Sequence, residues 1–268
     1  MPFLEHLEEL RGVLLQSAAL VALFACGGWF LSSEGLDLLI RPVGSLVFLG
    51  PTEAFTLRLK IALLLGFLAS LPFVLYKVWS FVAPGLFERE RRFVVLVVGA
   101  STVLFLAGAA FGLFVLVPIA VAFLLGFGTE SLRPMIAAGN YFAFVTKLLL
   151  AFGVVFQLPL AVTLLTHVGL LQPEWLLRKW RYAIVVIAVV SAVLTPPDVA
   201  SQILMGVPVL ALYFLSILIS FAVRKKRREE NERDRESEEG EGGEETGGEN
   251  GDEIEEETER VRRTEDPE

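Results

Sequence analysis

Long apolar runs separated by short polar segments dominate the pattern along the 268 residues. Six runs are candidates for membrane spans: residues 13–31, 61–81, 93–127, 142–165, 182–194 and 199–223. A spanning helix needs about 20 apolar residues to cross about 30 Å of hydrocarbon. These runs are too long, and alternate too little, for the strands of a membrane barrel. The pattern therefore predicts an all-α integral membrane protein with six transmembrane helices.

The fifth run is short for a membrane span. Residues 182–194 would rise only about 20 Å as an α-helix. The turn Thr195-Pro196-Pro197-Asp198 follows, and neither proline offers an N–H to continue a helix. The fifth and sixth runs are therefore predicted to form a helical hairpin. A re-entrant hairpin that does not cross the membrane is the alternative interpretation.

Basic residues are distributed unevenly between the two ends of the predicted spans. With six spans, one side gathers 13 Lys and Arg residues and the other side gathers 5. The first set is Arg11, Lys77, Arg89, Arg91, Arg92, Arg178, Lys179, Arg181 and 224–228, and the second is Arg41, Arg58, Lys60, Arg133 and Lys147. Lys and Arg concentrate in cytoplasmic loops, so both termini are predicted to be cytoplasmic.

Composition divides the chain into three parts. The hydrophobic fraction is 54% and the charged fraction 20%, whereas soluble domains have about 25% charged residues. Residues 224–268 carry a net charge of −10 and the rest of the chain +2, so the overall net charge of −8 comes from the tail. We expect an amphipathic cytoplasmic segment at residues 1–12, a six-helix transmembrane domain at 13–223, and a tail at 224–268. The tail would begin as a basic anchor and continue as a disordered acidic segment.

The candidate chemistry is sparse. The two histidines belong to no catalytic or metal-binding motif, and the single cysteine, Cys26, allows no intrachain disulfide. No acidic residue lies inside a predicted span, and Gln157 is the polar side chain near the middle of the fourth. Ion-coupled transporters usually carry intramembrane acids. Their absence counts against a secondary transporter or permease, which stays open as an alternative class. An intramembrane enzyme is a third class, disfavoured because no nucleophile-base set is present.

A charged turn joins the second and third runs. Residues 81–92 read F-V-A-P-G-L-F-E-R-E-R-R, and the N-terminal segment carries Glu9 on an acidic helical face. Glu88 and Glu90 can pair with the neighbouring arginines, which is a structural interpretation. Alternatively, Glu9 and Glu90 share a cytoplasmic patch that would suit a ligand with two guanidinium groups, since arginine binds carboxylates in a bidentate manner.

Several ordered motifs resemble the TatC family, the polytopic receptor subunit of the twin-arginine protein translocase. They are H-L-E-E-L-R at 6–11, L-P-F-V-L-Y-K-V-W-S-F-V-A-P-G-L at 71–86, E-R-R at 90–92, A-F-G-V-V-F-Q-L-P at 151–159 and L-T-P-P-D-V-A-S-Q at 194–202. The resemblance covers residues 3–223. It implies six spans that form a concave cup in the cytoplasmic (inner) membrane, with both termini cytoplasmic.

The resemblance also implies a function and a set of site residues. Family members bind the twin-arginine signal peptides of folded cargo, work with single-span subunits of the TatA and TatB type, and use the proton-motive force. They need no cofactor, metal or nucleic acid, and self-association in a complex is expected. Glu9 and Glu90 would receive the signal arginines. The residues expected to shape that site are Arg11, Phe81, Pro84, Leu86, Arg91 and Arg92.

Three further positions match family positions of functional importance. Pro42 lies in the first outer loop, and Asp198 ends the T-P-P-D turn. Gln157 stands where the family often has glutamate, which is a departure, because glutamine cannot titrate. Gln157 could still dock a partner helix through its amide, or it could make an interhelical bond within this chain.

Overall fold

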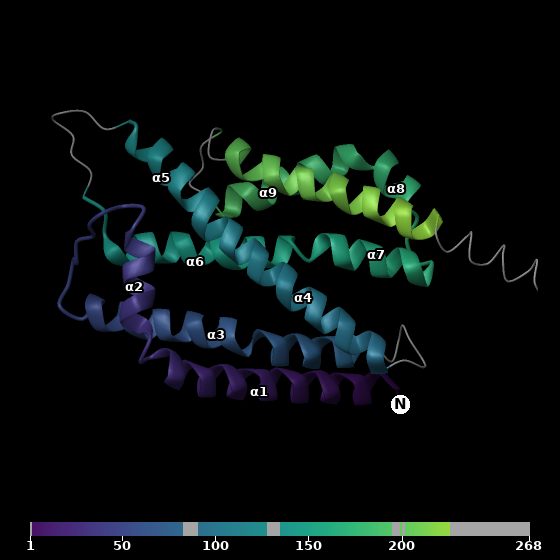
Figure 1. The fold of residues 1–268 in the computed structure, drawn as a ribbon, viewed down its shortest axis with the longest axis horizontal. Helices are drawn as coiled ribbons and strands as arrows, with labels where there is room; N and C mark the ends of the chain where they lie inside the picture. Colours follow the sequence, from purple (N-terminus) through teal and green to yellow (C-terminus); the bar gives the residue numbers. More distant parts are fainter. Residues whose placement is uncertain (1, 83–90, 128–134, 195–198, 200–201, 226–268) are drawn as a thin grey trace, which may run out of the picture. The chain divides into compact units, whose positions relative to one another are not determined.

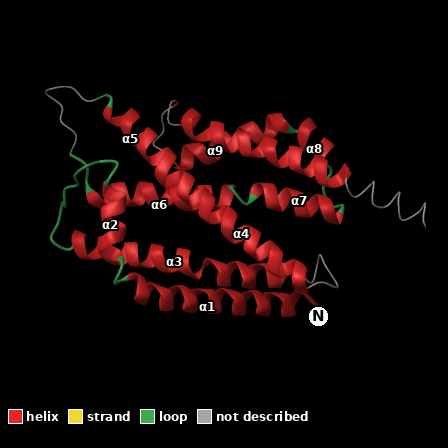
Figure 2. Cartoon of the chain, in the orientation of Figure 1, coloured by secondary structure: helices red, strands yellow, loops and turns green. Residues whose placement is uncertain are grey.

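The computed structural model describes residues 2–82, 91–127, 135–194, 199 and 202–225. The chain divides into two units, Met1–Ile219 and Ser220–Glu268, and the following description concerns the first unless stated. The described residues are almost entirely helical, and they contain no strand apart from one isolated bridge between Val47 and Ala137 (Figure 2). The predicted fold class, an all-α membrane protein, is confirmed.

Every predicted span corresponds to a helix. The described part has five helices that are long and apolar enough to cross a membrane: Leu7–Gly28, Glu53–Phe81, Val94–Leu125, Ala138–Val168 and Gln202–Lys225. A shorter apolar helix at Trp180–Val193 corresponds to the predicted fifth run, and it is short as expected. The predicted acidic tail lies beyond Lys225, outside the described residues.

The first half of the molecule consists of α1 (Pro2–Gly28), α2 (Ser32–Ile40), α3 (Glu53–Val82) and α4 (Arg91–Phe111) (Figure 1). Helix α1 runs without a break through the segment predicted to be a separate amphipathic region at residues 1–12. The short helix α2 ends before Pro42. Pro72 stays inside α3 and does not end it.

The third span is not one regular helix. After α4, the backbone passes through a π-helical segment, Gly112–Leu116, into α5 (Val117–Leu125). Pro118 is the second residue after that segment and lies within the first turn of α5. Proline has no backbone N–H, so the regular i→i−4 ladder cannot continue through it, and a π-turn accommodates the missing bond. Long helices commonly change direction at such segments.

The fourth span is interrupted by proline as well. Helix α6 (Ala138–Val155) and helix α7 (Leu158–Val168) are separated by a turn at Phe156 and Gln157, and Pro159 stands in the first turn of α7. Because Pro159 cannot donate a hydrogen bond to the carbonyl of Val155, α6 ends there. Helix α7 in turn ends at Gly169, whose φ of 86° is a left-handed conformation that glycine adopts without strain.

The remaining elements are α8 (Pro173–Arg178), α9 (Trp180–Leu194) and the C-terminal helix Gln202–Lys225. The hydroxyl of Tyr213 donates to the carbonyl of Leu176 at 2.8 Å, and Nε2 of Gln202 donates to the carbonyl of Ala188 at 2.8 Å. These bonds tie the C-terminal helix to α8 and α9. The core comprises two clusters, one around Ile61, Phe105 and Val145, and one that holds the C-terminal helix through Met205 and Val209.

Candidate functional site

The start of α1, the end of α3 and the start of α4 lie at one end of the first unit (Figure 1). Helices α1 and α3 pack against each other along their length. A Cβ atom added at Gly28 would meet Ala62, and one added at Gly66 would meet Ala25, so residue numbers fall along one helix as they rise along the other. This antiparallel register places Glu9 of α1 near the level of Phe81, at the end of α3.

Two predicted site residues are exposed on the first helix. The side chains of Glu9 and Arg11 are exposed at the surface of α1. Phe81 is partly buried at the end of α3. The structure therefore brings Glu9 and Arg11 to the same end of the first unit as Phe81, which is about 70 residues further along the chain.

Other predicted site residues fall in the segment between α3 and α4. Glu90, Pro84 and Leu86 lie outside the described residues, as does Asp198 in the turn after α9. Arg91 and Arg92 open α4, and only their backbone is described. Their assignment to the signal-peptide site remains a prediction.

Gln157 makes an interhelical bond. It lies in the turn between α6 and α7, and its Nε2 donates to the backbone carbonyl of Ser101 on α4 at 2.9 Å. The hydroxyl of Ser101 accepts a hydrogen bond from Nε1 of Trp79 on α3 at 2.8 Å. Ser101 is fully buried, so these three residues form a polar link between α3, α4 and the α6–α7 turn. The docking of a partner helix at Gln157 stays a prediction.

Pro42 belongs to a folded outer loop. Val47 and the residues around Ala137 exchange two backbone hydrogen bonds of 3.0 Å, from Val47 N–H to Ile136 and from Ala138 N–H to Val47. The hydroxyl of Tyr141 donates to the carbonyl of Leu39 at 2.7 Å, which ties the end of α2 to α6. The loop that carries Pro42 is thereby held against the start of α6.

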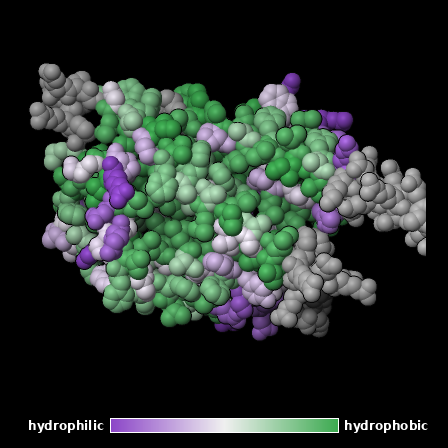
Figure 3. All heavy atoms as spheres, in the orientation of Figure 1, coloured by the Kyte–Doolittle hydropathy of each residue, from purple (hydrophilic) through white to green (hydrophobic). Residues whose placement is uncertain are grey.

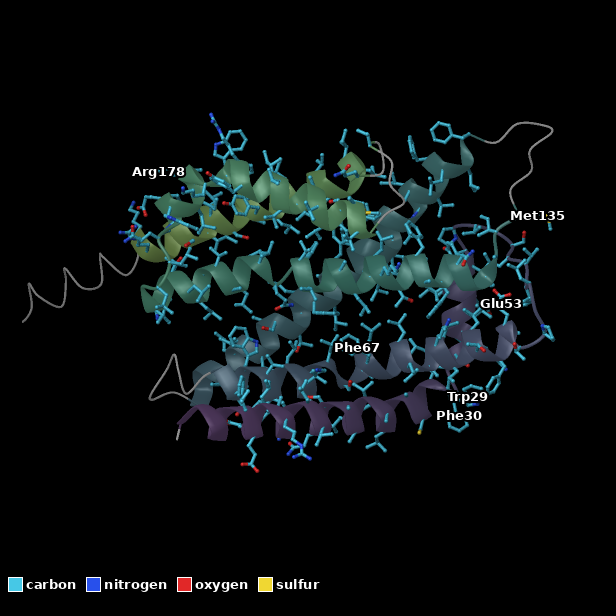
Figure 4. All side chains as sticks on the ribbon, turned by 180° about the vertical axis from the view of Figure 1, so that it is seen from behind. Trp29, Phe30, Glu53, Phe67, Met135 and Arg178 are labelled. Atoms are coloured by element: carbon cyan, nitrogen blue, oxygen red, sulfur yellow. The ribbon has the colours of Figure 1, made fainter. Side chains whose placement is uncertain are left out.

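Glu53 is the residue that sequence reasoning missed. One carboxylate oxygen accepts the N–H of Leu49 in the outer loop, and the other accepts the N–H of Gly139 at the start of α6 at 2.7 Å. Figure 4 shows Glu53 between the beginnings of α3 and α6. Its position directly after Pro51-Thr52 at a helix start was the available signal, since acids are favoured in the first turn of a helix. The partner N–H groups could not be identified from sequence.

Polar residues gather toward the two ends of the molecule in Figure 3, whereas the surface between them is mostly apolar. Arg178, Lys179 and Arg181 lie at the junction of α8 and α9, and Lys179 stacks over the ring of Tyr182 at 5.1 Å.

Among the described residues, no three His, Cys, Asp or Glu side chains are placed to hold a metal ion. The arrangement defines a multi-pass α-helical membrane protein with charged residues toward its ends.

The comparisons with known proteins identify the family. The family model "Sec-independent protein translocase protein (TatC)" matches residues 5–208, and the chain belongs to this family. The TatC protein of Carboxydothermus hydrogenoformans is 39% identical over 84% of this chain and 95% of that protein. The TatC protein of Aquifex aeolicus is 35% identical over 85% of this chain and 98% of that protein.

A solved structure matches in fold as well as in sequence. A crystal structure of the twin-arginine translocase receptor TatC superposes with a TM-score of 0.74 at 33% identity, covering 82% of this chain and 99% of that one. The chain is therefore a multi-pass inner-membrane protein of a protein translocase family, and the family is one of transport receptors, not of enzymes. Family membership implies a translocase system with further Tat subunits.

Proposed function

We propose that this chain is the twin-arginine signal-peptide receptor and core subunit of a translocase that exports folded proteins across the cytoplasmic membrane. Its membership of the TatC family and its likeness to a TatC receptor structure support this function. The proton-motive force would supply the energy, and single-span subunits of the TatA and TatB type would complete the complex. Self-association within that complex is part of the proposal.

The observation that carries the proposed site is the register of α1 against α3. It brings an exposed carboxylate, Glu9, to the end of α3 where the charged turn begins. Glu90 precedes α4 by one residue, and it would supply the second carboxylate. Two carboxylates on helix ends match two signal arginines, because each guanidinium presents a planar pair of donors to a carboxylate. Arg11, Arg91 and Arg92 would shape the site, and a lysine would match a carboxylate less well because its ammonium group lacks the planar pair of donors.

Photo-crosslinking of a twin-arginine signal peptide tests this assignment. We expect Glu9→Ala and Glu90→Ala each to weaken crosslinking by at least about tenfold, since a charged hydrogen bond contributes about 1.5–3 kcal/mol. Membrane insertion of both variants, measured by their level in the membrane fraction, should be unchanged. A signal peptide with two lysines in place of its arginines should already crosslink weakly to the unmodified chain.

Glu8→Ala is the matched control for Glu9→Ala. Glu8 is also an exposed carboxylate of α1, and its side chain projects about 100° away around the helix. Crosslinking by Glu8→Ala should stay near the level of the unmodified chain. If the Glu9→Ala, Glu90→Ala double variant crosslinks normally, the site assignment is wrong while the family assignment stands.

A further inference from the structure

Two lysines border one apolar groove between α3 and α6. The groove has a volume of about 460 Å³, and Lys60 of α3 and Lys147 of α6 line it together with apolar side chains that include Leu64, Phe67 and Phe142. Figure 4 shows Phe67 on α3, on the side that faces α6. Both lysine side chains are exposed, so their ammonium groups are available to a ligand.

The two lysines lie at similar depths in the predicted outer half of the membrane. Lys60 comes about two turns after the start of α3, and Lys147 about two and a half turns after the start of α6. The carboxylate of Glu53 at the start of α3 accepts the N–H of Gly139 at the start of α6. The two helices therefore begin at about the same level, and positions along them can be compared by counting turns. Both lysines therefore lie below the outer loops and alongside the lipid.

The combination of two positive charges with an apolar surface indicates which type of ligand the groove would take. An ammonium group surrounded by hydrocarbon is costly, and lysine side chains reach toward the interface to reduce that cost. No carboxylate lines the groove among the described residues. Glu53 is the carboxylate at the start of α3, and both of its oxygens already accept backbone N–H groups. The Glu53 carboxylate attracts Lys60 electrostatically, but it does not line the groove. The two ammonium groups at the groove therefore favour an anionic ligand.

We propose that this groove binds an anionic phospholipid of the outer leaflet, with its phosphate between Lys60 and Lys147. One acyl chain would lie along Leu64, Phe67 and Phe142. The volume falls within the range of about 300–1,000 Å³ for small-molecule sites, whereas a partner helix with its side chains is about 10 Å wide and would need a longer furrow. An anionic amphiphile fits both the charges and the apolar walls. This inference does not depend on the signal-peptide site.

Native mass spectrometry of the purified full-length chain tests the proposal. The chain is exchanged into detergent micelles that contain equal amounts of phosphatidylglycerol and phosphatidylcholine. We expect selective retention of phosphatidylglycerol, which should fall at least about tenfold in the double variant Lys60→Gln, Lys147→Gln, because two charged contacts are lost. The double variant Lys60→Arg, Lys147→Arg keeps both charges and should keep the selectivity.

Arg58→Gln is the matched control. Arg58 is an exposed cation of the same α3 segment that does not line the groove, so its loss should leave phosphatidylglycerol retention unchanged. Thermal unfolding in detergent and signal-peptide crosslinking report whether each variant is folded. Unchanged retention in a folded Lys60→Gln, Lys147→Gln variant overturns the proposal.

A photoreactive residue at position 63 separates the possible occupants in intact membranes. Leu63 lines the same groove, and we expect it to capture lipid. Capture of a polypeptide in place of lipid would assign the groove to a protein partner and would also overturn the proposal.

Discussion

At the scale of single residues, Ser101 joins three helical segments through two hydrogen bonds. Its hydroxyl accepts from Trp79 and its carbonyl accepts from Gln157. The residue is fully buried, so neither bond is exchanged for water in the folded protein. In a membrane, such interhelical bonds contribute about 0.6 kcal/mol on average and up to about 1.7 kcal/mol.

Ser101→Ala should therefore lower stability. The substitution leaves Nε1 of the part-buried Trp79 without its acceptor, and an unsatisfied donor of this kind costs up to about 1–3 kcal/mol. Thermal unfolding of the purified protein in detergent measures the loss. Thr102→Ala is the control, because the hydroxyl of Thr102 donates to the carbonyl of Val98 in its own helix and its removal strands no donor. Equal effects of the two substitutions would contradict the role given to Ser101.

At the scale of elements, close approach of helix backbones decides how the spans pack. Gly66 of α3 faces the backbone of Ala25, and Gly108 of α4 faces the carbonyl of Phe152 on α6. Small residues at such crossings allow dense packing between membrane helices, where lipid supplies no hydrophobic drive for association. The same α1–α3 contact sets the level of Glu9 relative to Phe81.

Gly66→Ala tests that dependence. Alanine is the better helix former by about 1 kcal/mol, but the added methyl group would overlap the backbone of Ala25, which cannot rotate away. Overpacking of this kind costs about 1–3 kcal/mol, so we expect net destabilisation. Signal-peptide crosslinking should fall as well, because α1 and α3 would shift apart.

Gly99→Ala on α4 is the matched control for Gly66→Ala, since an added Cβ atom there would meet no atom of another described helix within 4 Å. It should be neutral or stabilising in the same thermal unfolding measurement. A Gly66→Ala variant as stable as Gly99→Ala would show that α1 and α3 can separate at no cost.

At the scale of the whole molecule, helix α9, the fifth predicted span, decides how many times the chain crosses the membrane. Helix α9 has 15 residues, which rise only about 22 Å. A crossing helix of that length requires local thinning of the bilayer. If α9 crosses, the turn that contains Asp198 lies on the outer side, whereas a re-entrant hairpin would keep it inside the membrane.

Cysteine labelling distinguishes the two topologies. The native Cys26 is first replaced by alanine, and Asp198→Cys is then treated with a membrane-impermeant maleimide on intact cells. We expect labelling from outside. Trp175→Cys on the exposed surface of α8 is the control, and it should react only after the cytoplasmic face is opened. An unreactive Asp198→Cys in a folded protein would favour the re-entrant hairpin.

Much of the fold could be predicted from the order of apolar and polar residues. The six helical regions follow from hydropathy, because backbone groups in lipid must be satisfied within the helix. The end of α2 before Pro42 and the short fifth helix were also predictable from proline positions. The π-helical segment before Pro118 was not predicted, because proline permits a kink, a break or a π-turn, and packing selects among them.

Part of the candidate site, too, could be predicted from the sequence and part could not. Charge and motif order indicated Glu9 and the turn at residues 81–92, since acids and arginines at span ends stand out against apolar runs. The partner of Gln157 could not be predicted, because Ser101 is on another helix and offers its backbone carbonyl, which every residue possesses. The same applies to Glu53, whose partners are the N–H groups of Leu49 and Gly139.

The sequence by itself thus determined the class of protein, the positions of its apolar helices and the family that it resembles, and it predicts cytoplasmic termini. These properties depend on local hydropathy, charge and motif order, which are readable one segment at a time. Only the tertiary structure decided that Glu9 stands level with Phe81, and that Lys60 and Lys147 share one groove. Helix register and rotation depend on contacts between residues far apart in sequence, and the apolar pattern of a lipid-facing helix leaves both undetermined.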